Sequence, residues 1–310
     1  MDRHLSDNIT DFIINTVGEE YVSFNEPMNE HTTFKIGGNA TCFCKPQNKD
    51  QIKKLIAFFS ENDVEYYVIG NGSNLLVSDD GFDGVVVQLL DDYSDVQIDG
   101  DGGDIIVKSK SGARMWKLGM SIAKAGGAGF EFATGIPGTI GGAVMMNAGA
   151  YGGEMKDIVE SVLVCDKKGN ELTLRGDELE FGYRTSAIST NGYIVLEVEI
   201  KLQAGDTQEI MSRIDDLTER RRSKQPLDIP SAGSTFKRPE GYYAAKLIDD
   251  AGLRGIKVGG AKVSEKHAGF VINTGGATAA DVVALTDKIK EEVYKKDGVE
   301  LELEVRKLGF

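Results

Sequence analysis

The sequence has no long apolar segment and no excess of basic residues. No window approaches the roughly 18 consecutive apolar residues of a membrane-spanning helix, so we expect no membrane partner. The 35 lysines and arginines face 49 aspartates and glutamates, which gives a formal net charge of −14. This balance argues against nucleic-acid binding, which needs a basic footprint. An anionic substrate would need a local cluster of positive side chains.

Cysteine and histidine are scarce as well. An odd number of cysteines without the spacing of a disulfide framework predicts a cytoplasmic protein whose thiols are packed in the core. A metal or redox role for the Cys-x-Cys pair is the less favoured alternative. The N-terminus lacks a signal-peptide core. The histidines lack zinc-site spacing and Gly-x-Ser-x-Gly is absent, so we predict neither a metal site nor a serine-hydrolase triad. The residues concerned are Cys42, Cys44, Cys165, His4, His31 and His267.

Glycine, by contrast, is abundant, and it is concentrated in residues 129–153. This stretch holds eight glycines in 25 residues and almost no charge in its middle. Because glycine lacks a Cβ, the backbone here can turn sharply and approach a ligand closely. The stretch therefore predicts a loop wrapped around a flat, largely apolar ligand, and tight turns between strands are the alternative.

A second glycine motif, Gly70–Leu75, follows a predicted strand directly. It begins like the dinucleotide-binding Gly-x-Gly-x-x-Gly motif, but its sixth residue is Leu75 rather than glycine. It is also followed by predicted strands rather than by a helix. A Rossmann fold is therefore rejected. The backbone N–H groups of this turn could still hold a pyrophosphate as a nest, and a plain hairpin turn is equally compatible.

The order of the predicted elements divides the chain into three parts. Residues 1–72 alternate helix and strand, residues 73–203 are predicted to be mostly β with at most two helices, and residues 204–310 form a separate α+β domain. The lone Trp116 is expected on the core side of a helix over 114–124. The predicted helices cover 5–17, 50–62, 114–124, 206–224, 242–251 and 278–296, and the predicted strands cover 22–46, 64–69, 75–77, 84–89, 85–111, 159–166, 171–174, 193–202 and 300–308.

Three polar residues and one basic run could carry chemistry. Arg184 lies between strands, Ser234 follows small residues that leave its hydroxyl accessible, and Glu304 shares one strand face with Glu302 and Arg306. Each could instead be an ordinary surface or turn residue. The cations of residues 220–224 suit a helix C-terminus, and they could equally clamp a diphosphate.

Six segments, in order over residues 33–306, resemble the flavoprotein family of UDP-N-acetylenolpyruvoylglucosamine reductase. They are Thr33–Gly38, Gly70–Asn74, Gly135–Gly142 with Asn147–Tyr151, Tyr183-Arg184, Ala232–Phe236 and Leu301–Arg306. The resemblance implies an α+β protein in which a two-part FAD-binding module of the vanillyl-alcohol-oxidase type (residues 1–72 and 73–203) precedes a C-terminal substrate-binding domain (204–310).

The resemblance also implies roles for individual residues. The catalytic residues would be Arg184, Ser234 and Glu304. Non-covalent FAD would contact Asn71, Gly72, Ser73, Asn74, Thr134, Pro137, Gly138, Thr139, Gly142, Ala143, Arg221 and Arg306. The UDP-sugar would contact Tyr183, Lys224 and Arg238, the last at a position where some members have asparagine. Only 49 residues separate Arg184 from Ser234, so the chain resembles the shorter subclass, which lacks the subdomain with a substrate-closing tyrosine.

The implied reaction uses NADPH as co-substrate. NADPH would reduce FAD, and a hydride from FAD N5 would add to the terminal carbon of the enolpyruvyl group of UDP-N-acetylglucosamine enolpyruvate. Arg184 and Glu304 would stabilise the developing charge and Ser234 would protonate C2, which gives the UDP-N-acetylmuramate of peptidoglycan precursor synthesis. We expect a cytoplasmic monomer. The alternatives are another FAD-dependent oxidase or dehydrogenase of this fold that acts on a small alcohol or sugar, and a flavin-binding protein without turnover.

Overall fold

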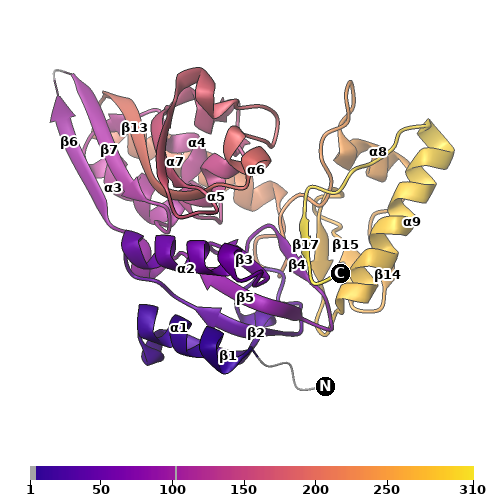
Figure 1. The fold of residues 1–310 in the computed structure, drawn as a ribbon. Helices are drawn as coiled ribbons and strands as arrows, with labels where there is room; N and C mark the ends of the chain where they lie inside the picture. The colour runs from indigo at the N-terminus through magenta and orange to yellow at the C-terminus, as the bar shows by residue number, and fades with distance from the viewer. Residues whose placement is uncertain (1–4, 102) are drawn as a thin grey trace. The chain divides into compact units, whose positions relative to one another are not determined.

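A computed structural model describes residues 5–101 and 103–310, so His4 lies outside the described part of the chain. The chain forms two compact units that interleave in sequence. The first unit comprises the residues up to Phe24 together with Cys42–Asn71 and Gly84–Arg220, and the second comprises Asn25–Thr41, Gly72–Asp83 and Arg221–Phe310. Figure 1 traces the elements of each unit along the chain.

The N-terminal α/β layer contains two amphipathic helices and a four-stranded sheet of order β1-β2-β5-β3. Phe12 and Phe58 stack between the helices with ring centroids 3.7 Å apart, and Asn48 caps the second helix by accepting a hydrogen bond from the Gln51 N–H. The predicted alternation of helix and strand is confirmed. The elements are α1 (Asp7–Val17), β1 (Val22–Pro27), β2 (Asn39–Cys44), α2 (Lys49–Glu61), β3 (Tyr66–Ile69) and β5 (Phe82–Gln88).

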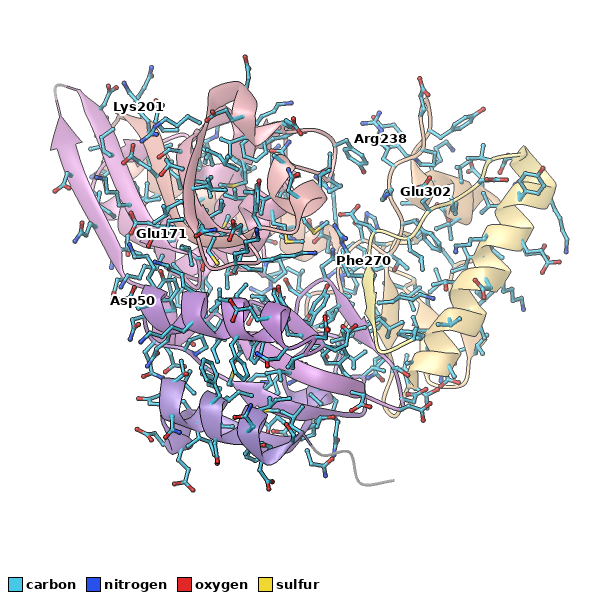
Figure 2. The ribbon with its side chains drawn as sticks, viewed as in Figure 1. Asp50, Glu171, Lys201, Arg238, Phe270 and Glu302 are labelled. Atoms are coloured by element: carbon cyan, nitrogen blue, oxygen red, sulfur yellow. The ribbon has the colours of Figure 1, made fainter. Side chains whose placement is uncertain are left out.

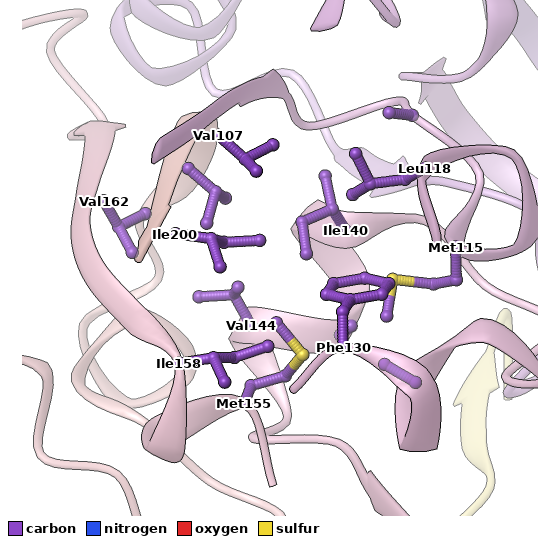
Figure 3. Close-up of a cluster of buried hydrophobic side chains, with 14 of the residues drawn as sticks. Val107, Met115, Leu118, Phe130, Ile140, Val144, Met155, Ile158, Val162 and Ile200 are labelled. Atoms are coloured by element: carbon purple, nitrogen blue, oxygen red, sulfur yellow. The ribbon is translucent and has the colours of Figure 1, made fainter. Parts of the chain in front are cut away.

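The rest of the first unit is built on a larger sheet of order β12-β11-β13-β7-β6, with β8 paired to β13. Its neighbouring strands pair antiparallel. Figure 3 shows how Val107, Val162 and Ile200 of this sheet and Ile140 and Phe130 of the glycine-rich stretch share one apolar core. The strands of this sheet are β6 (Val96–Asp101), β7 (Asp104–Lys110), β8 (Gly127–Ala128), β11 (Val159–Cys165), β12 (Glu171–Arg175) and β13 (Ile194–Ala204). The short strands β9 (Gly149–Ala150) and β10 (Gly153–Glu154) pair with each other in a separate sheet.

The prediction of at most two helices in this region is wrong. Four α-helices occur between residues 73 and 203 in the described part of the chain, and three of them have only four to six residues. Helices this short do not complete an amphipathic repeat, so periodicity cannot reveal them. They are α3 (Met115–Lys124), α4 (Glu131–Thr134), α5 (Ile140–Met145) and α6 (Ala187–Asn191).

The placement of Trp116 on the core side is also wrong. The buried face of α3 is formed by Met115, Leu118 and Ile122, whereas Trp116 lies off this face and is 55% exposed. Lys117 Nζ lies 6.0 Å from its ring centroid. A tryptophan can therefore lie outside the apolar stripe of its helix, because the smaller side chains on that stripe already fill the core.

The second unit joins segments that are far apart in sequence. β4 pairs parallel with β17, three short antiparallel strands form a sheet, and α9 begins with the predicted capping box of Thr278 and Asp281. The predicted strand over 300–308 is only partly correct, because regular pairing covers Arg306–Leu308 and Leu303 forms an isolated bridge. The elements of this unit are β4 (Leu75–Val77), α8 (Ala244–Asp250), β14 (Lys257–Val258), β15 (Ala261–Val263), β16 (Val271–Asn273), α9 (Ala279–Asp297) and β17 (Arg306–Leu308). The helix α7 (Thr207–Lys224) belongs to the first unit up to Arg220 and to the second unit from Arg221.

The cysteines are packed thiols, as predicted: all three are free and buried. Burial raises the pKa of Cys42 and of Cys165 to about 12. Across the described residues, no helix combines the length and apolarity needed to cross a bilayer.

Candidate active site

In the first unit, Gly70 and Asn71 contact the glycine-rich stretch directly. A Cβ on Gly70 would lie 2.3 Å from Thr139 Oγ1, so only glycine lets the two segments approach this closely. Asn71 Nδ2 donates a hydrogen bond of 2.6 Å to the Pro137 carbonyl. The Gly70–Leu75 motif and the glycine-rich stretch, more than 60 residues apart in sequence, are therefore in contact. This contact is expected if both motifs bind one ligand.

Arg114, which the sequence reasoning did not select, fixes this junction. Its Nη1 donates to Asn71 Oδ1 at 2.9 Å, and its Nε and Nη2 bind the Asp91 carboxylate. The backbone of Arg114 forms a bridge with Thr139. Hydrogen bonds from Arg114, and then from Lys117, hold the pKa of Asp91 below its ordinary value. In the sequence, Arg114 is only an arginine at the start of a predicted helix, and this pattern is too common to reveal its hydrogen bonds to Asn71 and Asp91.

The loop over residues 134–143 presents main chain rather than large side chains at its exposed positions. Gly135, Pro137 and Gly142 are exposed. The Thr139 hydroxyl caps α5 by accepting a hydrogen bond from the Gly142 N–H. Thr134 differs, because it is buried in α4 and a Cβ on Gly119 would meet its hydroxyl at 2.3 Å. The Thr134 side chain thus packs against α3. Gly138 is half-buried and Ala143 is buried.

In the second unit, Gly72 adopts the left-handed conformation, with φ +59°. A Cβ here would lie 2.0 Å from the His31 carbonyl oxygen, and the Gly72 carbonyl accepts a hydrogen bond from the Thr33 N–H at 3.3 Å. The Thr33–Gly38 segment therefore supports this turn. Among the described residues, no acceptor pairs with the backbone N–H groups of Gly72 or Ser73. Such donors in a turn can bind an anion.

Asn74 links the turn to the C-terminal segment. Its Nδ2 donates to the Glu304 carbonyl at 3.2 Å, and its own carbonyl accepts from the Arg306 N–H at 3.0 Å. Arg306 is exposed at the start of β17. The predicted cofactor residues Asn74 and Arg306 and the predicted catalytic residue Glu304 are therefore neighbours.

The segment that contains Ser234 pairs with the segment that contains Glu302 and Glu304. The Glu304 N–H donates to the Thr235 carbonyl at 2.9 Å, and the Lys237 N–H donates to the Glu302 carbonyl at 2.8 Å. Lys237 Nζ also forms a 2.9 Å ion pair with Glu302, which Figure 2 labels. Ser234 is exposed, as predicted, and Glu304 is half-buried. A hydroxyl and a carboxyl group thus come from one pair of extended segments.

The remaining predicted cations of the second unit lie at a helix end and in a loop. At the C-terminus of α7, Arg221 Nε donates to Gln225 Oε1 at 2.9 Å, and Lys224 is exposed. Arg238, labelled in Figure 2, donates from Nε to the Tyr242 carbonyl, and its guanidinium lies 4.1 Å from the Tyr243 ring centroid. Arg238 is therefore held by a cation–π contact as well as a hydrogen bond.

Arg184 belongs to the first unit, whereas Ser234 and Glu304 belong to the second. It has φ +56° in the turn between Gly182 and Thr185, and its guanidinium lies 5.0 Å from the exposed Tyr183 ring. A long side chain in the left-handed region is uncommon, and such strain often marks a functional position.

Two family models match separate parts of the chain. An FAD binding domain model matches residues 40–175, which defines the chain as a flavin-binding protein with a further C-terminal domain. A model of the C-terminal domain of UDP-N-acetylenolpyruvoylglucosamine reductase matches residues 225–308. The predicted α+β fold, with an FAD-binding module before this domain, is confirmed.

Full-length similarity supports the same family. The UDP-N-acetylenolpyruvoylglucosamine reductase of Clostridioides difficile (strain 630) is 50% identical and aligns over 96% of both chains. That of Alkaliphilus oremlandii (strain OhILAs) is 50% identical over 94% of this chain and 95% of its own. The crystal structure of the reductase from Thermus caldophilus is 34% identical, with a TM-score of 0.79, over 93% of this chain and 98% of that chain. The chain belongs to the UDP-N-acetylenolpyruvoylglucosamine reductase family.

Proposed function

We propose that the protein is an FAD-containing, NADPH-dependent oxidoreductase that reduces UDP-N-acetylglucosamine enolpyruvate to UDP-N-acetylmuramate. The observation that carries the proposal is 50% identity to reductases of this name over nearly the whole chain. The hydrogen bond from the Glu304 N–H to the carbonyl of Thr235, the residue after Ser234, supports it. In this role the enzyme acts in peptidoglycan precursor synthesis, and thus in cell-wall biogenesis, cell shape and division.

The residues present fit FAD. Exposed main chain at Gly135 and Gly142 suits a flat apolar ring, and the N–H donors of Gly72 and Ser73 suit a pyrophosphate. The chemistry that bound FAD supplies is hydride transfer, from NADPH to the enolpyruvyl group. The proposed FAD contacts are Asn71, Gly72, Ser73, Asn74, Thr134, Pro137, Gly138, Thr139, Gly142, Ala143, Arg221 and Arg306.

Each proposed catalytic residue has a separate task. Ser234 delivers a proton to C2 of the substrate as general acid, which suits its exposed hydroxyl. Arg184 stabilises the negative charge that develops on the enolpyruvyl carboxylate, and Glu304 assists through a hydrogen bond. Tyr183, Lys224 and Arg238 contact the UDP-sugar.

The wider organisation follows from these assignments. Residues 1–72 and 73–203 hold FAD and residues 204–310 hold the substrate, in line with the ranges that the family models match. We place the enzyme in the cytoplasm, because its three thiols are free. We further propose a monomer of the shorter subclass.

The substitution Ser234→Ala tests the assignment by separating the two half-reactions. We expect NADPH to bleach the flavin absorbance at the wild-type rate, while substrate reduction slows at least about 100-fold because the proton donor is missing. Ser121→Ala changes another exposed serine, on α3, and is the matched control. Normal substrate reduction in Ser234→Ala would refute the general-acid role. Peroxide formation without a preference for NADPH would favour an oxidase of the same fold.

A further inference from the structure

Asn147 is a buried amide whose hydrogen-bonding groups are all used by neighbouring segments. It is 1% exposed. Its Nδ2 donates to Glu154 Oε2 and to the Gly182 carbonyl, both at 3.0 Å, and its Oδ1 accepts from the Lys156 N–H at 3.0 Å. A side-chain amide offers two donor hydrogens and one acceptor oxygen, so each is satisfied here. The residue therefore ties three stretches of chain together.

The backbone of Asn147 explains why the position suits asparagine. Its φ is +43°. Asparagine is among the few non-glycine residues that enter this left-handed region readily. Glycine would accept the conformation but has no amide, and glutamine would place its amide one methylene further away. The conformation and the three hydrogen bonds together favour this one residue type.

Met145, the last residue of α5, and Asn147 form hydrogen bonds to the two ends of the turn that contains Arg184. The first end is held at the Gly182 carbonyl by the Asn147 amide. The second end is held by Ser186, whose hydroxyl donates to the Met145 carbonyl at 2.7 Å. Between these points the chain forms a tight turn closed by the Gly182–Thr185 bridge. The left-handed backbone of Arg184 is thus fixed from both sides.

The same amide also orients a negative charge. Glu154 accepts a hydrogen bond from Asn147 and forms a 2.8 Å ion pair with Lys156. Lys156 is the largest cause of its lowered pKa, the Asn147 hydrogen bond also contributes, and attraction to the Arg184 guanidinium adds to them. The ionised carboxylate of Glu154 therefore attracts the guanidinium as well.

We propose that Asn147 is a positioning residue that aims the Arg184 guanidinium, by holding the Gly182–Thr185 turn and by orienting the Glu154 carboxylate. The inference rests on the proposed function, in which Arg184 stabilises charge on the enolpyruvyl substrate. Asn147 itself is buried, so it acts through Arg184 rather than on the substrate. Small displacements of a charge-stabilising group can lower a rate about 100-fold.

The test measures both half-reactions of the FAD-loaded full chain. Asn147→Gly keeps the positive φ and removes the amide, and Asn147→Asp keeps the shape but replaces the donor hydrogens by a carboxylate beside Glu154. We expect substrate reduction to slow about 10- to 100-fold in both variants, with flavin reduction by NADPH unchanged. Asn25→Gly is the matched control, because Asn25 also has a positive φ (53°) and its amide oxygen accepts a hydrogen bond from Asn39.

Arg184→Ala provides the background that separates positioning from a general structural effect. If Asn147 acts through Arg184, Asn147→Gly should cause little further loss once Arg184 is alanine. An equal loss in both backgrounds, or full substrate reduction in Asn147→Gly, would overturn the inference. If Asn147→Gly does not retain flavin, Asn147→Asp is compared in the wild-type and Arg184→Ala backgrounds in its place. Normal substrate reduction by Arg184→Ala alone would refute the proposed function of Arg184 instead.

Discussion

The contact between Gly70 and Thr139 tests whether the absence of a Cβ at residue 70 is what lets the two segments pack closely. In Gly70→Ala, the new Cβ would lie 2.3 Å from Thr139 Oγ1, 3.0 Å from Cγ2 and 3.2 Å from Cβ. The first of these distances is well below any ordinary van der Waals contact, so one of the two segments must move. Overpacking of this kind costs about 1–3 kcal/mol. The cost falls on the junction that Asn71 and Pro137 also form.

The same strain should weaken FAD binding if this junction holds the cofactor. Because 1.4 kcal/mol corresponds to a tenfold change in a dissociation constant, we expect the Kd for FAD to rise about 5- to 150-fold. Titration of the flavin-free chain with FAD, followed by flavin fluorescence, measures this change, and urea unfolding measures the loss of stability. Gly100→Ala is the control, because Gly100 is exposed and a Cβ there meets only Ile105 Cδ1, at 3.9 Å.

A double-mutant cycle identifies the cause. Thr139→Ala removes both Oγ1 and Cγ2, so Gly70→Ala should cost less in that background, with a coupling energy of about 1 kcal/mol or more. Thr139→Ala by itself loses the cap of α5 and sets the baseline for the comparison. Wild-type stability and FAD affinity in Gly70→Ala, or additive effects in the cycle, would refute the close-approach argument.

Two further predictions concern titratable groups. Burial, more than any other cause, lowers the pKa of His267, and its Nδ1 accepts a hydrogen bond from the Gly269 N–H. The unfolded chain therefore binds the proton more tightly than the folded chain does. The free energy of unfolding should consequently fall as the pH drops from about 6.5 through the lower folded-state pKa. Urea unfolding at several pH values should show a flatter dependence in His267→Gln, and an unchanged slope would contradict this. The raised pKa and burial of Cys42 predict that the native chain resists thiol reagents at pH 8 and reacts only in urea, so rapid native labelling at Cys42 would contradict the packing.

The order of elements could be predicted because most long segments have a clear period. The long helix α9 is an example: its capping box at Thr278 and its apolar repeat define both its existence and its start. The short helices α4, α5 and α6 could not be found in this way. Their caps were the only local signals, since Thr139 and Ser186 precede two of them. A single threonine or serine before a glycine-rich or polar segment is equally typical of a turn.

The pairing of the Ser234 segment with the Glu304 segment could not be predicted from local sequence patterns. Alternation around Glu304 correctly predicts that Leu301 and Val305 are buried and Glu302 is exposed. It does not predict the partner, because the hydrogen bond from Glu304 to Thr235 joins residues about 70 positions apart. Burial can alternate along any extended segment, even where ladder pairing is limited to one bridge. The resemblance to a family, rather than periodicity, suggested that these residues belong together.

The glycines of residues 129–153 lie in two different environments. Gly141 has no space for a side chain, since a Cβ would lie 2.7 Å from Ser111 Cβ, and a Cβ on Gly153 would lie 2.6 Å from the Phe132 ring. At Gly142 a Cβ would meet only Thr139 Oγ1, at an ordinary 3.7 Å, and the residue is exposed. Packing within the protein therefore explains Gly141 and Gly153 but gives no reason for glycine at Gly142. A ligand that lies against the main chain would supply that reason, so Gly142 carries the argument for a cofactor surface.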